Sequence, residues 1–378
     1  MGSAACLLVA LVVSAEHGFA NFSVSAEVRG SAPLDGSASS INPQLSVQPT
    51  MDVGYVAGAL RAGLGYHPLF TVSNLTPAFL HRMQATGELR VSPSRRALVD
   101  QSLSFGQYDT SLGNLGLAGD GLPPLLSLGI VDYLTSDTAA GFDGALVPRL
   151  RLRATAGYHV SGGLTEAARV GLPLEQGPRL TLELQHEATR RDSVSLHVKA
   201  SGDQFSNGKL AGVAEGGVTW RSTLTRDTTL TVGAGAAAVD STSTGGAAVP
   251  VGALGVSYGV PRLRFSVDTS YAPQADAKTG DIFRRAGVSA SAEYKPRGDL
   301  TARASFGGTV SLGTVGIDPR DDQTVGDRSL LGEASLAWRE GITEISGGLR
   351  GANASVSGTS ATELRAYVAF SLKATAVR

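Results

Sequence analysis

The 378-residue sequence has few cysteines, few charged residues and few aromatic residues. Its one cysteine, Cys6, lies close to the N-terminus, so no disulfide can form in the rest of the chain. Charged residues make up 17% of the total, below the roughly 25% of ordinary globular domains, and the net charge is -1. This balance, without blocks of like charge, lacks the basic surface expected of a nucleic-acid-binding domain.

The chain also lacks a long apolar run after its N-terminus, which excludes a transmembrane helix there. The N-terminus itself has an apolar stretch from Ala4 to Val13, followed by small residues at Ala15 and Ala20. This pattern predicts a secretory signal peptide over residues 1–20, although no Lys or Arg precedes the stretch. The alternative is a buried N-terminal segment. We expect residues 21–378 to form a single domain.

Alternation of apolar and polar residues dominates the remaining sequence, and helical periodicity is almost missing. Leu180, Leu182 and Leu184, for example, alternate with polar residues. Such period-two runs predict β-strands, and runs of about ten residues match the length of a tilted transmembrane strand. Other runs with the same pattern lie at residues 22–28, 82–91, 194–201, 263–271, 286–294, 300–306 and 364–372.

The connections between these runs alternate in length along the chain. Short polar turns are expected at residues 92–94, 147–149, 190–192, 225–227, 260–262, 296–299 and 339–341, two of them with the sequence Val-Pro-Arg. Longer segments, such as 110–128 and 313–327, lie between them. An up-and-down antiparallel barrel, with tight turns at one end and long loops at the other, has this arrangement. A β-sandwich with Greek-key connections gives no reason for it.

Counting strands from these turns gives an all-β transmembrane barrel of 16–18 strands. Seven turns define fourteen strands, and one strand at each end makes sixteen. An N-terminal hairpin, with strands near residues 22–28 and 44–54, raises the number to eighteen, which we favour. Either number is even, as in single-chain bacterial barrels.

With these features, nearly all of the mature chain resembles the outer-membrane β-barrel proteins of Gram-negative bacteria. The last run, ELRAYVAFSLKATAVR, resembles the C-terminal strand that the barrel-assembly machinery recognises, although it does not end in an aromatic residue. The Pro-Arg turn repeat, the strand number and the sequence GQYDTS at Gly106–Ser111 show a weaker similarity to barrels that accompany polysaccharide-export systems. The resemblance implies location in the outer membrane, with outer-membrane lipid, the assembly machinery and periplasmic export components as partners.

In such a barrel the apolar face of each strand contacts lipid and the polar face lines the lumen. A secreted soluble β-protein would reverse this geometry. Charged residues predicted to line the lumen are Arg151, Arg153, Glu183, Glu187, Arg221, Arg264, Asp268, Glu293, Arg303 and Glu333. They either bias the passage of ions or simply pair across strands. Residues predicted to form the interfacial aromatic girdles are Tyr158, Trp220, Tyr271, Tyr294 and Trp338; ordinary surface packing is the alternative.

A barrel of this width leaves a channel unless something plugs it. The apolar segment Thr110–Leu128 either folds inward and narrows the pore or forms a plain outer loop. The histidines are scattered without metal-ligand spacing, and no nucleophile elbow is present, so we expect no metal, no cofactor and no enzymatic activity.

The predicted function is a channel or conduit for a solute or an exported polysaccharide. The alternative is a structural or adhesive barrel with a closed lumen and partner-binding outer loops.

Overall fold

The computed structural model describes residues 18–33, 42–73, 76–109, 130–242, 245–276, 280–317, 327–356 and 359–377. These ranges contain nineteen strands and one short helix, α2 (Glu166–Gly171). The strands are β1 (Gly18–Pro33), β2 (Asn42–Ala57), β3 (Leu60–Tyr66), β4 (Leu69–Ser73), β5 (Thr76–Ser92), β6 (Arg95–Asp109), β7 (Ile130–Val147), β8 (Leu150–Gly163), β9 (Glu175–Glu187), β10 (Asp192–Phe205), β11 (Leu210–Thr223), β12 (Thr228–Ser241), β13 (Ala247–Val260), β14 (Leu263–Ala275), β15 (Ile282–Tyr294), β16 (Leu300–Thr314), β17 (Arg328–Glu340), β18 (Thr343–Val356) and β19 (Thr359–Val377).

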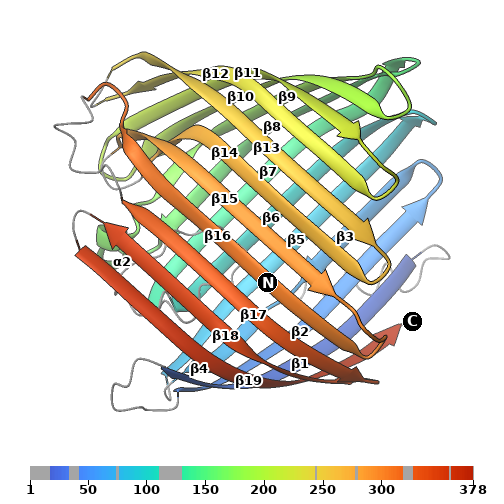
Figure 1. Ribbon diagram of the computed structural model, residues 1–378, viewed down its shortest axis with the longest axis vertical. Coiled ribbons are helices and arrows are strands. Elements are labelled where there is room, and N and C mark those ends of the chain that lie inside the picture. Colours follow the sequence, from blue (N-terminus) through green and yellow to red (C-terminus); the bar gives the residue numbers. More distant parts are fainter. Residues whose placement is uncertain are drawn as a thin grey trace.

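The strands form one antiparallel sheet that closes on itself. Apart from β3 and β4, consecutive strands pair with each other, and β1 pairs with β19 from Asn21↔Val377 to Pro33↔Arg365. Figure 1 shows the result as a barrel of slanted strands, with the blue N-terminal strands beside the red C-terminal strand. Closure gives every strand two partners, so the sheet has no free edge.

β3 and β4 together occupy a single position in the barrel. Both pair with β2 and with β5, and the register Met51↔Tyr66 continues without a shift to Val47↔Phe70. Between them lie His67 and Pro68, and Pro68 has no backbone N–H to donate to a neighbour. The barrel therefore has eighteen strand positions, which confirms the favoured number and the N-terminal hairpin.

The seven short turns predicted from the sequence all lie between consecutive strands. An eighth, at Gly58 and Ala59, was missed; Gly58 adopts a φ of 56°, a left-handed conformation that glycine accepts without strain. These eight turns lie at one end of the barrel, called here the short-turn end, and the long connections lie at the other end.

The alternating sequence pattern divides the sheet into two faces. Directly paired residues of an antiparallel sheet lie on the same face, so the register carries a face assignment from strand to strand. One face has large exposed apolar side chains, among them Leu182 on β9, Val198 on β10 and Phe265 on β14. They are exposed because this face is the outer wall of the closed barrel.

α2 is the one helix of the described residues, and it was not predicted. Thr165 caps it by accepting a hydrogen bond from the backbone N–H of Ala168. No helix within the described ranges has the length and hydropathy needed to cross a bilayer.

Some expectations fall partly outside the described ranges. The first three residues of β1, which begins at Gly18, fall within the expected signal peptide, and residues 1–17 lie outside the described part. The predicted inward loop Thr110–Leu128 also lies outside it, as does the end of the GQYDTS stretch beyond Asp109.

Candidate functional site: an arginine-lined pocket on the inner wall

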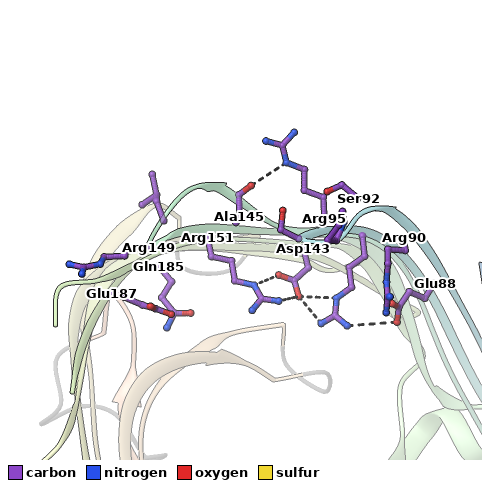
Figure 2. Close-up of a pocket in the computed structure, with 14 residues that line it drawn as sticks. Glu88, Arg90, Ser92, Arg95, Asp143, Ala145, Arg149, Arg151, Gln185 and Glu187 are labelled. Carbon is purple, nitrogen blue, oxygen red and sulfur yellow. Dashed lines mark hydrogen bonds and ion pairs between the residues drawn. The ribbon is translucent and has the colours of Figure 1, made fainter. Parts of the chain in front are cut away.

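A pocket of about 400 Å³ lies on the inner wall near the short-turn end, where β5 to β9 run side by side. Figure 2 shows the labelled side chains of Glu88, Asp143, Arg151, Gln185 and Glu187 turned from the strands toward the barrel interior. Five arginines and three carboxylates line the pocket: Arg90, Arg95, Arg96, Arg149, Arg151, Glu88, Asp143 and Glu187. The arrangement is a concave, polar and predominantly basic surface facing the lumen.

Asp143 on β7 is the centre of the charge network. Its Oδ2 accepts hydrogen bonds from Arg96 Nη2 and Arg151 Nη2, both at 2.8 Å. Its Oδ1 accepts a further one from Arg151 Nε at 2.5 Å. Strands β6, β7 and β8 bring these three residues together, because Arg96 lies directly opposite Asp143 and Arg151 lies near it across the next strand pair.

Three further ion pairs extend the network along the wall. Arg96 Nη1 lies 3.7 Å from Glu88 Oε2 on β5. Arg153 Nη2 lies 3.8 Å from Asp143 Oδ2, and Arg153 Nη1 lies 3.7 Å from Glu183 Oε2 on β9. The network thus spans five neighbouring strands and fixes the positions of three guanidinium groups.

Exposure differs sharply between the two signs of charge. The side chain of Asp143 is 1% exposed, whereas those of Arg96, Arg151 and Arg153 are 40%, 49% and 53% exposed. The carboxylate therefore lies beneath the arginines, and the surface that meets the lumen consists of guanidinium N–H groups. Guanidinium groups present a planar fork of donors suited to carboxylate and phosphate oxygens.

Arg90 and Arg149 contribute two more guanidinium groups at the edges of the pocket. Neither has a side-chain hydrogen bond or ion pair with another residue of the described ranges. Arg90 lies directly opposite Arg96 in the β5–β6 pair, and like charges in this position repel one another. The wall therefore keeps cationic groups that the protein itself does not neutralise.

Arg149 has an unusual backbone. Its φ of 67° is the one positive φ of a non-glycine residue within the described ranges. After Pro148, whose ring fixes φ near -65°, this conformation corresponds to a type II turn, in which Gly or Asn is usual at Arg149's position. An arginine there costs about 1–2 kcal/mol relative to a right-handed conformation.

A second Val-Pro-Arg turn, at Val260–Arg262, offers a comparison within the same chain. There the register continues regularly from Val260↔Leu263 to Gly259↔Arg264, and Arg262 has no positive φ. At the pocket, the register shifts between Ala145 and Val147, so the turn is accompanied by a bulge. The same three residues thus adopt two backbone conformations, and the strained one borders the pocket.

All ten charged residues predicted to line the lumen lie on the same face of the sheet as Asp143, according to the register. Arg151, Arg153, Glu183 and Glu187 lie in or beside the pocket. On another part of the wall Arg303 Nε donates to Glu293 Oε2 at 3.2 Å, beside Arg264. The remaining three are Arg221, Asp268 and Glu333. Glu333 belongs to a separate contact, in which its Oε1 accepts a hydrogen bond from the Tyr367 hydroxyl at 2.6 Å and its Oε2 lies 3.9 Å from Arg350 Nε.

The residues that the sequence did not single out are Asp143, Arg96 and Arg149. Asp143 lies in the stretch GFDGALV, where its flanking glycines give a weak strand pattern. Its role depends on pairing with Arg96, which is 47 residues away in the chain.

Four of the five aromatic residues predicted for the girdles are exposed on the outer face: Tyr158 (47%), Trp220 (39%), Tyr294 (49%) and Trp338 (37%). Trp338 Nε1 donates to Asp299 Oδ2 in the adjacent short turn at 3.2 Å. Trp220 makes the equivalent hydrogen bond to Asp192. Tyr271 differs, because it is half-buried and packs against an apolar cluster, so it does not fit the girdle assignment.

Two apolar clusters lie at the long-connection end of the barrel. In the first, Ala168 and Leu172 of the α2 segment pack with Leu80, Val131 and Tyr133, whose register places them on the inner face. In the second, buried residues from the ends of several strands meet near the β14–β15 hairpin: Phe205, Ala211, Ala237, Val239, Val249, Val251, Ile282 and Val315. Both clusters place apolar side chains on the inner side of the barrel wall at this end.

No group of three or more His, Cys, Asp or Glu residues in the described ranges could hold a metal ion. The exposed guanidinium groups of the pocket are suited to binding an anion. The residues that line the pocket include no nucleophile paired with a general base.

Comparison with known proteins gives both a family and a fold. A family described as the EpsX exopolysaccharide export family matches residues 96–339, which is more than half of the chain. No curated protein sequence matches significantly.

Among solved structures, the outer membrane protein OpdK from Pseudomonas aeruginosa is similar with a TM-score of 0.50 at 11% identity, over 94% of this chain and 99% of that one. OccK2 (OpdF) of the same organism, in complex with glucuronate, has a TM-score of 0.51 at 11% identity, over 94% and 98%. The siderophore receptor PirA from Acinetobacter baumannii has a TM-score of 0.50 at 9% identity, over 93% and 80%. At these identities the likeness is one of fold, that of outer-membrane barrels.

Proposed function

Because the chain belongs to the EpsX exopolysaccharide export family, we propose that it is a conduit through which an exported polysaccharide crosses the outer membrane. The observation that carries the proposal is the family match together with a closed eighteen-position barrel, whose outer face is apolar and whose inner face carries charge. A barrel of this size is too wide for its own wall residues to fill. In this proposal the short-turn end faces the periplasm, as in other bacterial barrels, and export follows cleavage of the N-terminal signal peptide.

The partners follow from this assignment. Outer-membrane lipid covers the apolar face, the barrel-assembly machinery inserts the chain, and periplasmic export components deliver the polymer to the short-turn end. No catalytic step is part of the proposal, since the conduit acts by binding and passage alone.

Two measurements test the proposal. The purified barrel, reconstituted in a planar bilayer, should show discrete channel conductance. A strain without the protein should retain polysaccharide inside the cell envelope, and the wild-type gene should restore polysaccharide to the cell surface.

The apolar clusters at the long-connection end favour one other candidate, a structural or adhesive barrel with a closed lumen. That barrel would leave the bilayer sealed. Sealing, combined with normal surface polysaccharide in the deletion strain, would contradict the conduit and support the structural alternative.

A further inference from the structure

We propose that the arginine-lined pocket binds acidic sugar residues of the exported polymer as it enters the barrel from the short-turn end; the inference rests on the proposed conduit function. The chemical class of the ligand is a sugar that carries a carboxylate.

A ligand in the pocket would contact guanidinium groups. Arg96, Arg151 and Arg153 expose 40–53% of their side chains to the lumen, while the carboxylate that orients them is covered. A guanidinium group has five N–H donors, and Asp143 occupies only some of them. The remaining donors point to the channel in fixed directions, which lowers the entropy that binding must overcome.

Two guanidinium groups of the pocket have no partner within the described ranges. Arg90 and Arg149 flank the network from opposite sides, and within the described ranges neither guanidinium has an acceptor. The acidic groups that face the pocket are Glu88, Asp143 and Glu187, and the first two are already paired with arginines. The unneutralised charge of the pocket is therefore positive.

The backbone at the edge of the pocket is strained. Arg149 occupies a left-handed position that glycine would occupy more favourably, whereas Arg262, in the other Val-Pro-Arg turn, does not. Strain of this kind is concentrated at binding sites, where the position of the side chain matters more than local stability. The turn keeps an arginine at the edge of the pocket at the expense of stability.

The position of the pocket along the barrel also fits this ligand. The pocket lies beside two short turns, at residues 92–94 and 147–149, at the end that faces the periplasm in the proposed orientation. An anionic polymer that arrives from that side meets the pocket before it reaches the apolar clusters at the opposite end.

Isothermal titration calorimetry on the detergent-solubilised full-length barrel tests the inference, with oligogalacturonate as the probe. The fully methyl-esterified oligomer has the same backbone and no charge, and it should bind at least tenfold more weakly. Added salt should weaken binding of the charged oligomer, because screening reduces attraction between exposed charges.

Substitutions separate the pocket from the general charge of the lumen. The double variant Arg90→Gln/Arg149→Gly leaves the Asp143 network intact and should raise the Kd of the oligogalacturonate about tenfold. Arg149→Gly alone should also raise the unfolding temperature, so a weaker affinity could not be due to a destabilised fold. The matched control, Arg262→Gly in the second Val-Pro-Arg turn, should leave the Kd within twofold of the wild type.

Three results would overturn the inference: no binding by the wild type, equal binding of the methyl ester, or an equal loss of affinity in Arg262→Gly. These results do not depend on conductance or on surface polysaccharide. A barrel that exports polymer and binds no oligogalacturonate would retain the proposed function and lose the inference. A barrel that binds the charged oligomer, leaves a bilayer sealed and is not needed for surface polysaccharide would fail as a conduit.

Discussion

At the scale of single residues, the hydrogen bond between Trp338 and Asp299 offers a pH-dependent signal at the short-turn end. Hydrogen bonds from Arg297 hold the pKa of Asp299, which lies in an exposed turn, below its ordinary value of about 3.9. A depressed pKa means that the ionised form is favoured in the folded protein. Its contribution to stability is present above the unfolded pKa and is lost as the pH falls through the folded pKa.

We therefore expect the fluorescence of Trp338 to change with a midpoint below pH 3.9 in a Trp220→Phe variant, in which Trp338 is the one remaining tryptophan. Asp299→Asn should remove the transition, because the amide does not titrate in this range. A midpoint at or above the ordinary pKa of aspartate would contradict the hydrogen bonds from Arg297 to Asp299.

The face assignment of the strands can be tested with two neighbouring residues in the middle of β9. Leu182 is 39% exposed on the outer face, and Thr181 on the inner face lies opposite Lys199. Leu182→Asp should destabilise the inserted barrel by about 1–2 kcal/mol, because a carboxylate would face lipid. Thr181→Asp should be tolerated, since the new charge lies opposite a cation.

The amount of heat-resistant, folded barrel in outer-membrane fractions, seen on unboiled gels, measures the effect. Equal losses in the two variants would show that the faces are assigned incorrectly.

At the scale of elements, the β14–β15 hairpin is the feature most distinct from a regular barrel. Pairing of β14 with β13 stops at Gly252↔Tyr271, while pairing with β15 continues to Ala275↔Ile282. The described residues of the tip of this hairpin, up to Asp276 and from Gly280, thus separate from β13 and pack over the ends of β10 to β13, where Ile282 is fully buried. A Cβ atom at Gly280 would lie 2.6 Å from Lys209 Cβ, so the tip also reaches the β10–β11 connection.

If this tip narrows the channel, releasing it should raise the single-channel conductance. Ile282→Asp places a charge in a fully buried apolar position, at a cost of several kcal/mol, and should detach the tip. Ile282→Val removes one methylene, costs about 1 kcal/mol and should leave the conductance unchanged. Equal conductance for the wild type and Ile282→Asp would show that the tip does not obstruct the pore.

Elements of this kind also show how far the sequence could predict the structure. The turns at residues 147–149 and 260–262 were predicted because proline and charge interrupt an alternating pattern. The eighth turn was missed because Gly58 and Ala59 carry neither signal. α2 spans six residues, too few for helical periodicity to appear in the sequence, and it is defined by packing against the inner wall.

The same distinction applies to the pocket. The alternating sequence pattern predicted a polar face for Arg151 and Arg153, because the face on which a residue lies depends on its own strand alone. The pairing of Asp143 with Arg96 and Arg151 depends on register across three strands, and the bulge beside Val147 shifts that register. A local pattern does not contain that information.

At the scale of the whole molecule, the structure depends on closure between the two ends of the chain. Ala26 on β1 and Leu372 on β19 lie directly opposite each other, although nearly the whole chain separates them. Directly opposite residues in antiparallel strands have Cα atoms about 4.5–5.5 Å apart, which is within the range of a disulfide. A bond at this seam would join the first barrel strand to the last.

We expect Ala26→Cys/Leu372→Cys, in a Cys6→Ser background, to form an intramolecular disulfide in the membrane. The boiled, non-reduced protein should migrate faster than the reduced one, because the crosslink keeps the denatured chain compact. The control pair Ala26→Cys/Ala369→Cys is displaced in register and lies on opposite faces, so it should not form the bond. Crosslinking of the control pair alone would place β19 in a different register, and failure of both pairs would mean that the barrel does not close at this seam.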